Sequence, residues 1–156
     1  MAFDPAEIKQ RQRIMWSSGN YPEIAQTIEG VAELVVERVG VKAGHDMLDV
    51  ATGSGNVAIP AADLGAHVVG LDLTPELFVV ARERAANAGV EVNWVEGDAE
   101  DLPFGDDSFD RVTSVFGAIF APRHQQAASE IVRVCKPGGR FAIAAWTPEG
   151  LNGQMF

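Results

Sequence analysis

The chain has 156 residues, of which 47% are hydrophobic and 22% charged, and its formal net charge is −10. This length fits one domain, the apolar fraction excludes a disordered chain, and the acidic balance disfavours a nucleic-acid partner. No apolar run approaches the roughly 18 residues that span a bilayer, and the N-terminal MAFDPAEIKQRQRIM lacks the apolar core of a secretory signal.

The N-terminal part predicts two helices. The segment before Tyr21 reads as a weak amphipathic helix that ends in a turn at residues 17–20. Pro22 suits the first turn of the next helix, since its missing N–H group is not needed there. Apolar residues at helical spacing continue that helix over residues 24–39, and Gly40 is a suitable stop.

Beyond Gly40, short apolar strands alternate with helices. We predict strands at Met47–Ala51, His67–Leu71, Val90–Val95, Phe109–Val115 and Arg140–Trp146, and helices at Val57–Leu64, Glu76–Ala88 and Gln125–Cys135. Thr74 is the expected N-cap of the helix at 76–88, and residues 137–139 form a turn. The alternation indicates an α/β fold with a doubly wound, mostly parallel sheet of about five strands. We assign this domain to residues 23–156, and residues 1–22 to a helical segment that covers its site.

The first strand runs into the glycine-containing turn Asp49-Val50-Ala51-Thr52-Gly53-Ser54-Gly55-Asn56. Gly53 and Gly55 permit close approach of a ligand, and the spacing Gly53-x-Gly55-x-x-Ala58 fits the loose dinucleotide fingerprint. Taken alone, the pattern also fits a connecting turn. Asp72 strengthens the binding interpretation because it ends the second strand about 20 residues later, where a carboxylate can accept hydrogen bonds from both ribose hydroxyls.

Asp49 separates two kinds of ligand. A carboxylate directly before the glycine turn repels a diphosphate, whereas it tolerates an ammonium or sulfonium group. The competing interpretation is a buried, hydrogen-bonded carboxylate that organises the turn, and both roles are compatible.

Acidic residues also follow the third strand. Asp98 can accept a hydrogen bond from the exocyclic amine of a purine, and the N–H group of Ala99 can donate to a ring nitrogen. For Glu100, Asp106 and Asp107 we expect solvated loop positions.

Four segments in chain order resemble a known family: LDVATGSGN, GLDLTPE, GDAEDLPFGDDSFDRV and VCKPGGRFAIAAW. They are similar to motifs of the class I S-adenosylmethionine-dependent methyltransferases, in particular the small-molecule, methyltransferase type 11 group that resembles ubiquinone and menaquinone biosynthesis enzymes. The resemblance runs from about residue 16 to the end. It implies a Rossmann-like fold, S-adenosyl-L-methionine as cofactor, and methyl transfer to an unidentified small-molecule acceptor.

The resemblance also implies roles for individual residues. The glycine turn borders the methionine part of the cofactor, Asp72 holds the ribose, Leu73 lies against the adenine, and Asp98 and Ala99 read its edge. Phe116 lies near the methionine end, and an upstream group closes over the cofactor or, for its aromatic members, packs on the sheet edge. The implied cofactor residues are Asp49, Ala51, Gly53, Gly55, Asp72, Leu73, Asp98, Ala99, Phe116, Trp16, Gly19 and Tyr21.

The sequence departs from the family pattern in two places. Ala51 stands where the family often has its first glycine, which lowers the affinity that we expect. The family sheet resembles a seven-stranded one, and no sequence here supplies the last two strands, so the chain looks C-terminally short. The fifth strand is then an unpaired edge, from which we expect a homodimer or an aggregation-prone monomer.

Little in the sequence indicates a catalytic group. Methyl transfer relies mainly on proximity and orientation. His124 is a weak candidate for a general base, and an exposed histidine at a helix start is the better explanation of this residue. We expect no metal site because the histidines are dispersed, and the single Cys135 excludes an internal disulfide and fits a cytoplasmic protein. The segment at 116–121 lines an acceptor pocket or packs in the core.

Two other functions remain open at this point. A NAD-dependent oxidoreductase domain explains the glycine turn and Asp72 but leaves Asp49 unexplained. A non-catalytic module that keeps the nucleoside pocket explains the same motifs without an acceptor region.

Overall fold

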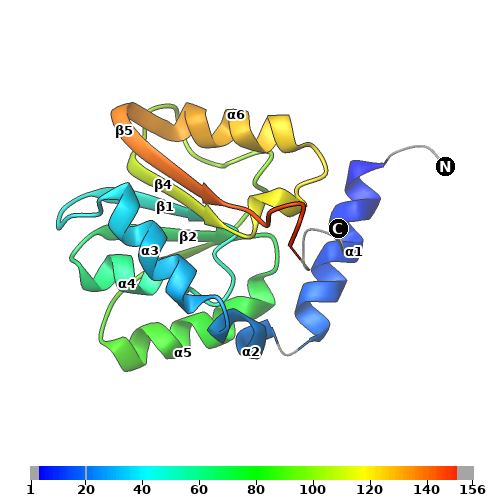
Figure 1. The fold of residues 1–156 in the computed structure, drawn as a ribbon, viewed down its shortest axis with the longest axis horizontal. Coiled ribbons are helices and arrows are strands. Elements are labelled where there is room, and N and C mark those ends of the chain that lie inside the picture. The colour runs from blue at the N-terminus through cyan, green and yellow to red at the C-terminus, as the bar shows by residue number, and fades with distance from the viewer. Residues whose placement is uncertain (1–3, 20, 151–156) are drawn as a thin grey trace.

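The computed structural model describes residues 4–19 and 21–150 (Figure 1). Its centre is a five-stranded sheet in the order β3-β2-β1-β4-β5, in which every strand pair is parallel. The strands are β1 (Asp46–Val50), β2 (His67–Asp72), β3 (Asn93–Glu96), β4 (Phe109–Val115) and β5 (Cys135–Ala144). The predicted doubly wound, Rossmann-like α/β fold is confirmed.

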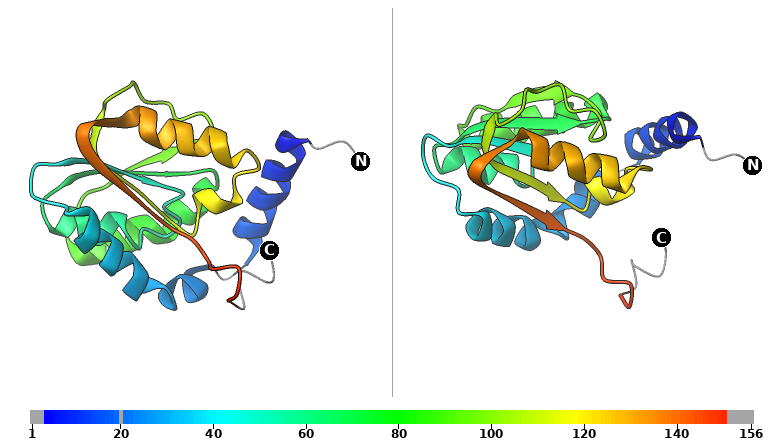
Figure 2. Two further views of the ribbon diagram at one scale, coloured as in Figure 1. Left: turned by 45° about the horizontal axis from the view of Figure 1, so that its top comes forward. Right: turned by 90° about the horizontal axis from the view of Figure 1, so that it is seen from above.

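Helices cover both faces of this sheet (Figure 2). The α-helices are α1 (Pro5–Ser18), α2 (Tyr21–Gln26), α3 (Glu29–Val39), α4 (Ala58–Asp63), α5 (Phe78–Ala88) and α6 (His124–Val134), and the 3-10 helices are η1 (Pro75–Leu77) and η2 (Ala118–Phe120). α6 packs on one face, whereas α3 and α4 pack on the other. α1 stands apart from both layers, at the ends of the strands (Figure 1).

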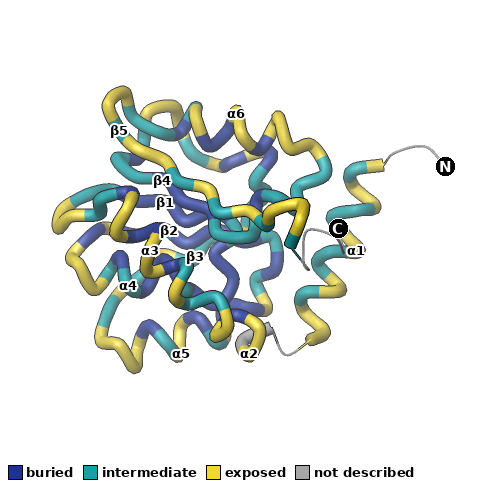
Figure 3. Tube along the Cα trace, viewed as in Figure 1, coloured by how far each residue is buried: buried dark blue, intermediate teal, exposed yellow. Residues whose placement is uncertain are grey.

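The core follows from the two-residue period of β1. Leu48 and Val50 face the α6 side, where they pack with Ile131. Met47 faces the other side and packs with Val36 of α3. Each of these large side chains is at least 95% buried, and burying one contributes about 1.5–3 kcal/mol. The centre of the sheet is therefore the most buried part of the molecule (Figure 3).

Two helices end at glycines, one of which is the predicted stop at Gly40. Gly40 ends α3 and Gly89 ends α5. Each adopts a φ near 70°, a left-handed conformation that is favourable for glycine because it has no Cβ atom. At the other end of the chain, Asp4 caps α1 by accepting a hydrogen bond from the Ala6 N–H group at 2.9 Å.

The N-terminal helices differ from the prediction in two ways. The helix expected through Val39 divides at residues 27–28, where both the N–H and the hydroxyl group of Thr27 donate to the Ile24 carbonyl. The side-chain bond offers the backbone an alternative to a continuous helix. The turn expected at 17–20 begins later, because Ser17 and Ser18 belong to α1 and return hydrogen bonds to its carbonyls.

Two later elements also differ. Thr74 makes no side-chain cap. Its hydroxyl, like its N–H group, interacts with Asp72, and the helix begins as the 3-10 turn η1. The last strand begins at Cys135 and includes the Pro-Gly-Gly segment expected as a turn, with a register shift opposite Phe109 and Arg111. Cys135 pairs with Phe109 and Arg140 pairs with Arg111, so residues 136–139 form an irregular bulge between these two pairs.

β5 lies at one edge of the described sheet. Phe141 and Ile143 are 52% and 44% exposed, so the strand presents apolar side chains to its surroundings. Among the described residues, no helix has the length and apolar character needed to cross a membrane.

Candidate functional site

A cavity lies beyond the carboxyl ends of the strands, where ligands bind in open α/β sheets. Its walls come from the turn after β1, the end of β2, the loop after β3, the segment after β4, and α1. The lining residues are Lys9, Gln12, Trp16, Ala51, Gly53, Leu71, Asp72, Leu73, Thr74, Leu77, Gly97, Asp98, Ala99, Phe116, Gly117, Phe120, Ala121 and Pro122.

Asp72 joins the turns that follow β1 and β2. One carboxylate oxygen accepts a hydrogen bond from the Gly53 N–H group at 2.8 Å, and the other accepts one from Thr74, also at 2.8 Å. Burial raises the pKa of Asp72 above its ordinary value, although these hydrogen bonds lower it. The Thr74 side chain and the Leu73 N–H group also interact with this carboxylate and lower its pKa, and Asp72 lines the cavity, where the donors of a ligand can approach it.

Asp49 lies behind the cavity wall and is 2% exposed. Its two carboxylate oxygens accept hydrogen bonds from the hydroxyls of Thr52 at 2.6 Å and Thr113 at 2.8 Å. Burial is the largest effect on the Asp49 carboxyl and raises its pKa to about 7, and the charge of nearby Asp72 acts in the same direction. Asp49 thus ties β1, its turn and β4 together, as the structural interpretation expects.

Arg84 of α5 holds the glycine turn from outside. Its guanidinium donates to the Ser54 carbonyl oxygen at 3.0 Å and to the Asn56 side chain at 2.6 Å, and it pairs with Glu29 at 2.8 Å. Asn56 in turn donates to the Ala25 carbonyl oxygen. The turn is therefore bound to α2, α3 and α5 through polar contacts.

Ala51 adopts a φ of 56°, a left-handed conformation that favours glycine. Its methyl group packs against Gly117, where an added Cβ would lie 2.3 Å from the Ala51 Cβ. Phe116 also has a positive φ of 53°, and its ring stacks on Trp146 at 3.8 Å between centroids. The alanine that departs from the family pattern is thus accommodated by a glycine on the facing segment.

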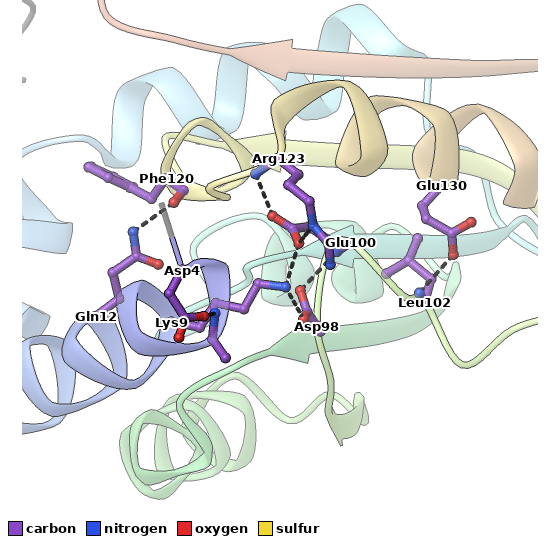
Figure 4. Close-up of polar contacts among 10 residues, drawn as sticks. Asp4, Lys9, Gln12, Asp98, Glu100, Leu102, Phe120, Arg123 and Glu130 are labelled. Atoms are coloured by element: carbon purple, nitrogen blue, oxygen red, sulfur yellow. Dashed lines mark hydrogen bonds and ion pairs between the residues drawn. The ribbon is translucent and has the colours of Figure 1, made fainter. Parts of the chain in front are cut away.

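A cluster of charges forms the outer end of the cavity (Figure 4). Lys9 reaches from α1 to Asp98, 2.6 Å away, and also pairs with Glu100. Glu100 is 2% exposed, so the expected solvated position is wrong: its carboxylate also accepts from the N–H and guanidinium groups of Arg123. Burial raises the pKa of Glu100, but the bonds from Lys9 and Arg123 outweigh it and hold this pKa below its usual value.

α1 covers the cavity without contributing a buried residue. Gln12 donates to the Phe120 carbonyl oxygen at 2.7 Å, and the ring of Trp16 meets that of Phe120 edge-on at 5.2 Å. The Trp16 side chain thus lines the cavity. Gly19 follows α1 and is exposed, and the side chain of Tyr21 lies outside the described part of the chain.

The predicted cofactor residues fall into two groups. The structure brings Ala51, Gly53, Asp72, Leu73, Asp98, Ala99, Phe116 and Trp16 together around the cavity. Asp49 and Gly55 support its wall from behind. His124 is exposed, and its Nε2 atom lies 2.8 Å from the Ile119 carbonyl oxygen. The described residues hold no group of three or more histidines, cysteines or carboxylates that fits a metal ion.

Sequence reasoning missed the contribution of α1. Lys9 and Gln12 line the cavity, yet each is a polar residue on a polar helix, and no local pattern reveals its distant partner. Thr52 and Thr113 were also missed as donors to Asp49. The only available signal for Thr52 was its place inside the glycine turn.

Comparisons with known proteins show similarity to methyltransferases. The family model described as a methyltransferase domain matches residues 48–143. A putative methyltransferase from Bacillus halodurans superposes with a TM-score of 0.70 at 36% identity, over 76% of this chain and 52% of that one. The residues matched by the family model, 48–143, include the glycine turn and the segments after β2, β3 and β4.

Curated relatives are longer than this chain. Uncharacterized protein Rv1403c of Mycobacterium tuberculosis is 49% identical over 92% of this chain and 53% of its own length. A demethylmenaquinone methyltransferase of Renibacterium salmoninarum is 40% identical over 73% of this chain and 46% of its own. The chain therefore spans about half the length of the curated relatives that it matches.

The raised pKa of Asp49 predicts a pH dependence of stability. Because the folded state holds the Asp49 proton more tightly than the unfolded state, the free energy of unfolding falls as pH rises from about 4 to about 7. Asp49→Asn removes this dependence, at most about 1.4 kcal/mol per pH unit. Urea unfolding at pH 5, 6 and 8 measures it, with the exposed Asp63→Asn as control. A variant whose stability follows that of the wild type across this range would contradict the prediction.

The contact between Ala51 and Gly117 predicts coupled mutations. Gly117→Ala forces two methyl groups together and should destabilise the fold by about 1–3 kcal/mol. Ala51→Gly removes the left-handed strain and should stabilise it by up to about 1 kcal/mol. The double variant should recover much of the loss, since only the Ala51 carbonyl oxygen, 3.0 Å away, then opposes the new methyl group. Additive effects in urea unfolding would show that the two sites do not interact.

Proposed function

Because the chain belongs to the methyltransferase domain family, we propose that it binds S-adenosyl-L-methionine in the described cavity and transfers a methyl group to a small-molecule acceptor. The observation that carries this proposal is the position of Asp72. A buried carboxylate at the end of β2 faces a cavity whose opposite walls are the glycine turn and the Asp98–Ala99 loop.

The chemistry of the lining fits the cofactor part by part. Asp72 offers acceptor lone pairs for the two ribose hydroxyls, and Leu73 and Leu77 offer apolar surface for a purine ring. Asp98 can accept from the exocyclic amine, while the Ala99 N–H group can donate to the ring. At the other end, Asp49 lies behind the turn and favours a cationic neighbour, since a positive charge would lower its raised pKa.

When bound, S-adenosyl-L-methionine supplies an activated methyl group on a sulfonium centre. The protein's part in transfer is then to orient and to exclude water. The glycine turn and Phe116 border the methionine end, and Trp16 closes the outer side of the cavity. His124 is not among the cavity residues, so we assign the transfer to proximity rather than to a general base.

A small, partly apolar acceptor suits the segment after β4. Phe120, Ala121 and Pro122 line the cavity next to Phe116 and offer little hydrogen-bonding capacity. The similarity to a demethylmenaquinone methyltransferase supports this class of acceptor. The competing candidate is a module that binds the cofactor without transferring a methyl group.

We further propose that residues 1–22 act as a cover for the site, that the protein works in the cytoplasm, and that two copies pair through β5. Exposed Phe141 and Ile143 give this edge an apolar surface, and the outer backbone groups of an edge strand can bond to a second strand. In a dimer with two-fold symmetry, each copy binds the other through the same β5 surface.

Ligand binding tests the cofactor assignment. Calorimetry should detect S-adenosylhomocysteine binding and no binding of NAD. Asp72→Asn keeps the shape of the side chain but loses charge and one acceptor, so its Kd should rise about 10–100-fold. Asp63→Asn is the matched control on the surface. Binding of NAD alone, or unchanged affinity in Asp72→Asn, would reject the site as proposed, and binding without methyl transfer to any acceptor in a panel would favour the non-catalytic module.

The dimer is tested separately by analytical ultracentrifugation. The wild type should sediment as a dimer at micromolar concentration. Phe141→Glu should yield a monomer, because it places a charge in the apolar pairing surface. Val79→Glu alters an equally apolar but distant exposed residue on α5 and should leave the dimer intact. A monomeric wild type would refute pairing through β5.

A further inference from the structure

The contact between Lys9 and the Asp98–Glu100 loop has no part in the function proposed so far. Lys9 extends from α1 so that its ammonium lies between two carboxylates that belong to the loop after β3 (Figure 4). Its side chain is 15% exposed. Burial lowers the pKa of Lys9, but the hydrogen bonds that its ammonium donates to Asp98 and Glu100 outweigh burial and raise this pKa above its ordinary value. Lys9 is therefore a fixed, charged member of the cavity wall.

Asp98 has two described hydrogen bonds, one on each carboxylate oxygen. The Glu100 N–H group donates to Oδ1 at 2.9 Å, and Lys9 donates to Oδ2 at 2.6 Å. The first bond alone leaves the carboxyl group free to turn about its side-chain torsions. The second bond fixes its plane, so that the remaining lone pairs keep one direction relative to the cavity.

The charge of Lys9 has a second effect on the same loop. Glu100 is buried and ionised, and it lies two residues from Asp98. Arg123 neutralises Glu100 from the α6 side, whereas Lys9 contacts both carboxylates at once. Without Lys9, like charges on a part-buried loop repel each other, which favours turning Asp98 outward.

We propose that Lys9 is a positioning residue for purine recognition: its ammonium holds the Asp98 carboxylate in the orientation that accepts the 6-amino group of the cofactor. This inference rests on the proposed function, because it requires adenine beside Asp98. Lys9 itself remains bonded to both carboxylates and does not touch the reacting methyl group. Its contribution is selectivity for a 6-amino purine.

The alternative role for Lys9 is simply to fasten α1. α1 has other anchors, since Gln12 bonds to Phe120 and Arg13 pairs with Glu96 at 2.8 Å. A fastening role would weaken every ligand that lies under α1 to a similar extent. A positioning role weakens only ligands that use the hydrogen bond to Asp98. Two ligands that differ only in the group bonded to Asp98 therefore distinguish the positioning role from the fastening role.

The experiment compares Kd values for S-adenosylhomocysteine and for its purine analogue without the 6-amino group. The wild type should prefer the amino compound at least about tenfold, the ratio typical of a lost bond to a charged group. Lys9→Met should bring this ratio below about threefold, and Lys9→Arg, which keeps charge and donors, should restore most of it. Arg11→Met removes the same charge from the same helix at an exposed position and should keep the wild-type ratio.

Thermal unfolding confirms that each variant is folded, which we expect because α1 contributes no buried residue. An unchanged ratio in Lys9→Met, with both ligands weakened equally, would overturn the positioning role and leave the fastening role. A wild type without preference for the amino compound would overturn recognition through Asp98. A wild type that does not bind S-adenosylhomocysteine at all would reject the proposed function, and this inference with it.

Discussion

The geometry of the cavity depends on one buried carboxylate, that of Asp72. Parallel pairing brings the ends of β1 and β2 to the same edge of the sheet, but it does not determine how the following turns lie. Asp72 determines this by accepting the N–H groups of Gly53 and Thr74 on its two oxygens. Its burial is unfavourable, as the raised pKa indicates, so the folded chain keeps a carboxylate whose charge is incompletely compensated. Hydroxyl donors from a bound ribose would supply part of that compensation, which links the stability of the edge to ligand binding.

The same edge concentrates negative charge. Asp49 and Asp72 lie at the carboxyl ends of the adjacent strands β1 and β2, Asp98 follows β3, and each lies in or behind a single cavity. A cavity of this kind disfavours diphosphate ligands and favours ligands that carry donors and a positive centre. Lys9 is the cation from outside the sheet that enters this group. It compensates the outer end of the cavity, while at the inner end the carboxyl groups of Asp49 and Asp72 accept hydrogen bonds from hydroxyl and backbone N–H groups.

Sequence alone predicted the parts of the molecule that depend on local pattern. The buried strands read correctly because a doubly covered parallel sheet needs apolar runs, and Gly53 and Asp72 were found because their spacing reflects the turn between two strands. What it missed depends on distant contacts. Thr74 looked like a helix cap, but its side chain and its N–H group both interact with Asp72. Glu100 looked solvated because acidic loops usually are, and only the approach of α1 and Arg123 buries it. No local sequence signal reports such partners.

Apolar packing and surface ion pairs contribute unequally to the stability of the fold. The sheet and its flanking helices are joined by apolar side chains worth about 1.5–3 kcal/mol each, whereas part-exposed ion pairs such as that of Arg13 contribute about 0–1 kcal/mol. α1 therefore separates from the sheet at lower free energy than any strand. Its anchors lie at both ends of the cavity, on the Asp98–Glu100 loop and on Phe120 of η2. Because one helix carries both anchors, its release opens the Asp98–Glu100 loop and the segment after β4 together, with Asp72 and the glycine turn still in place.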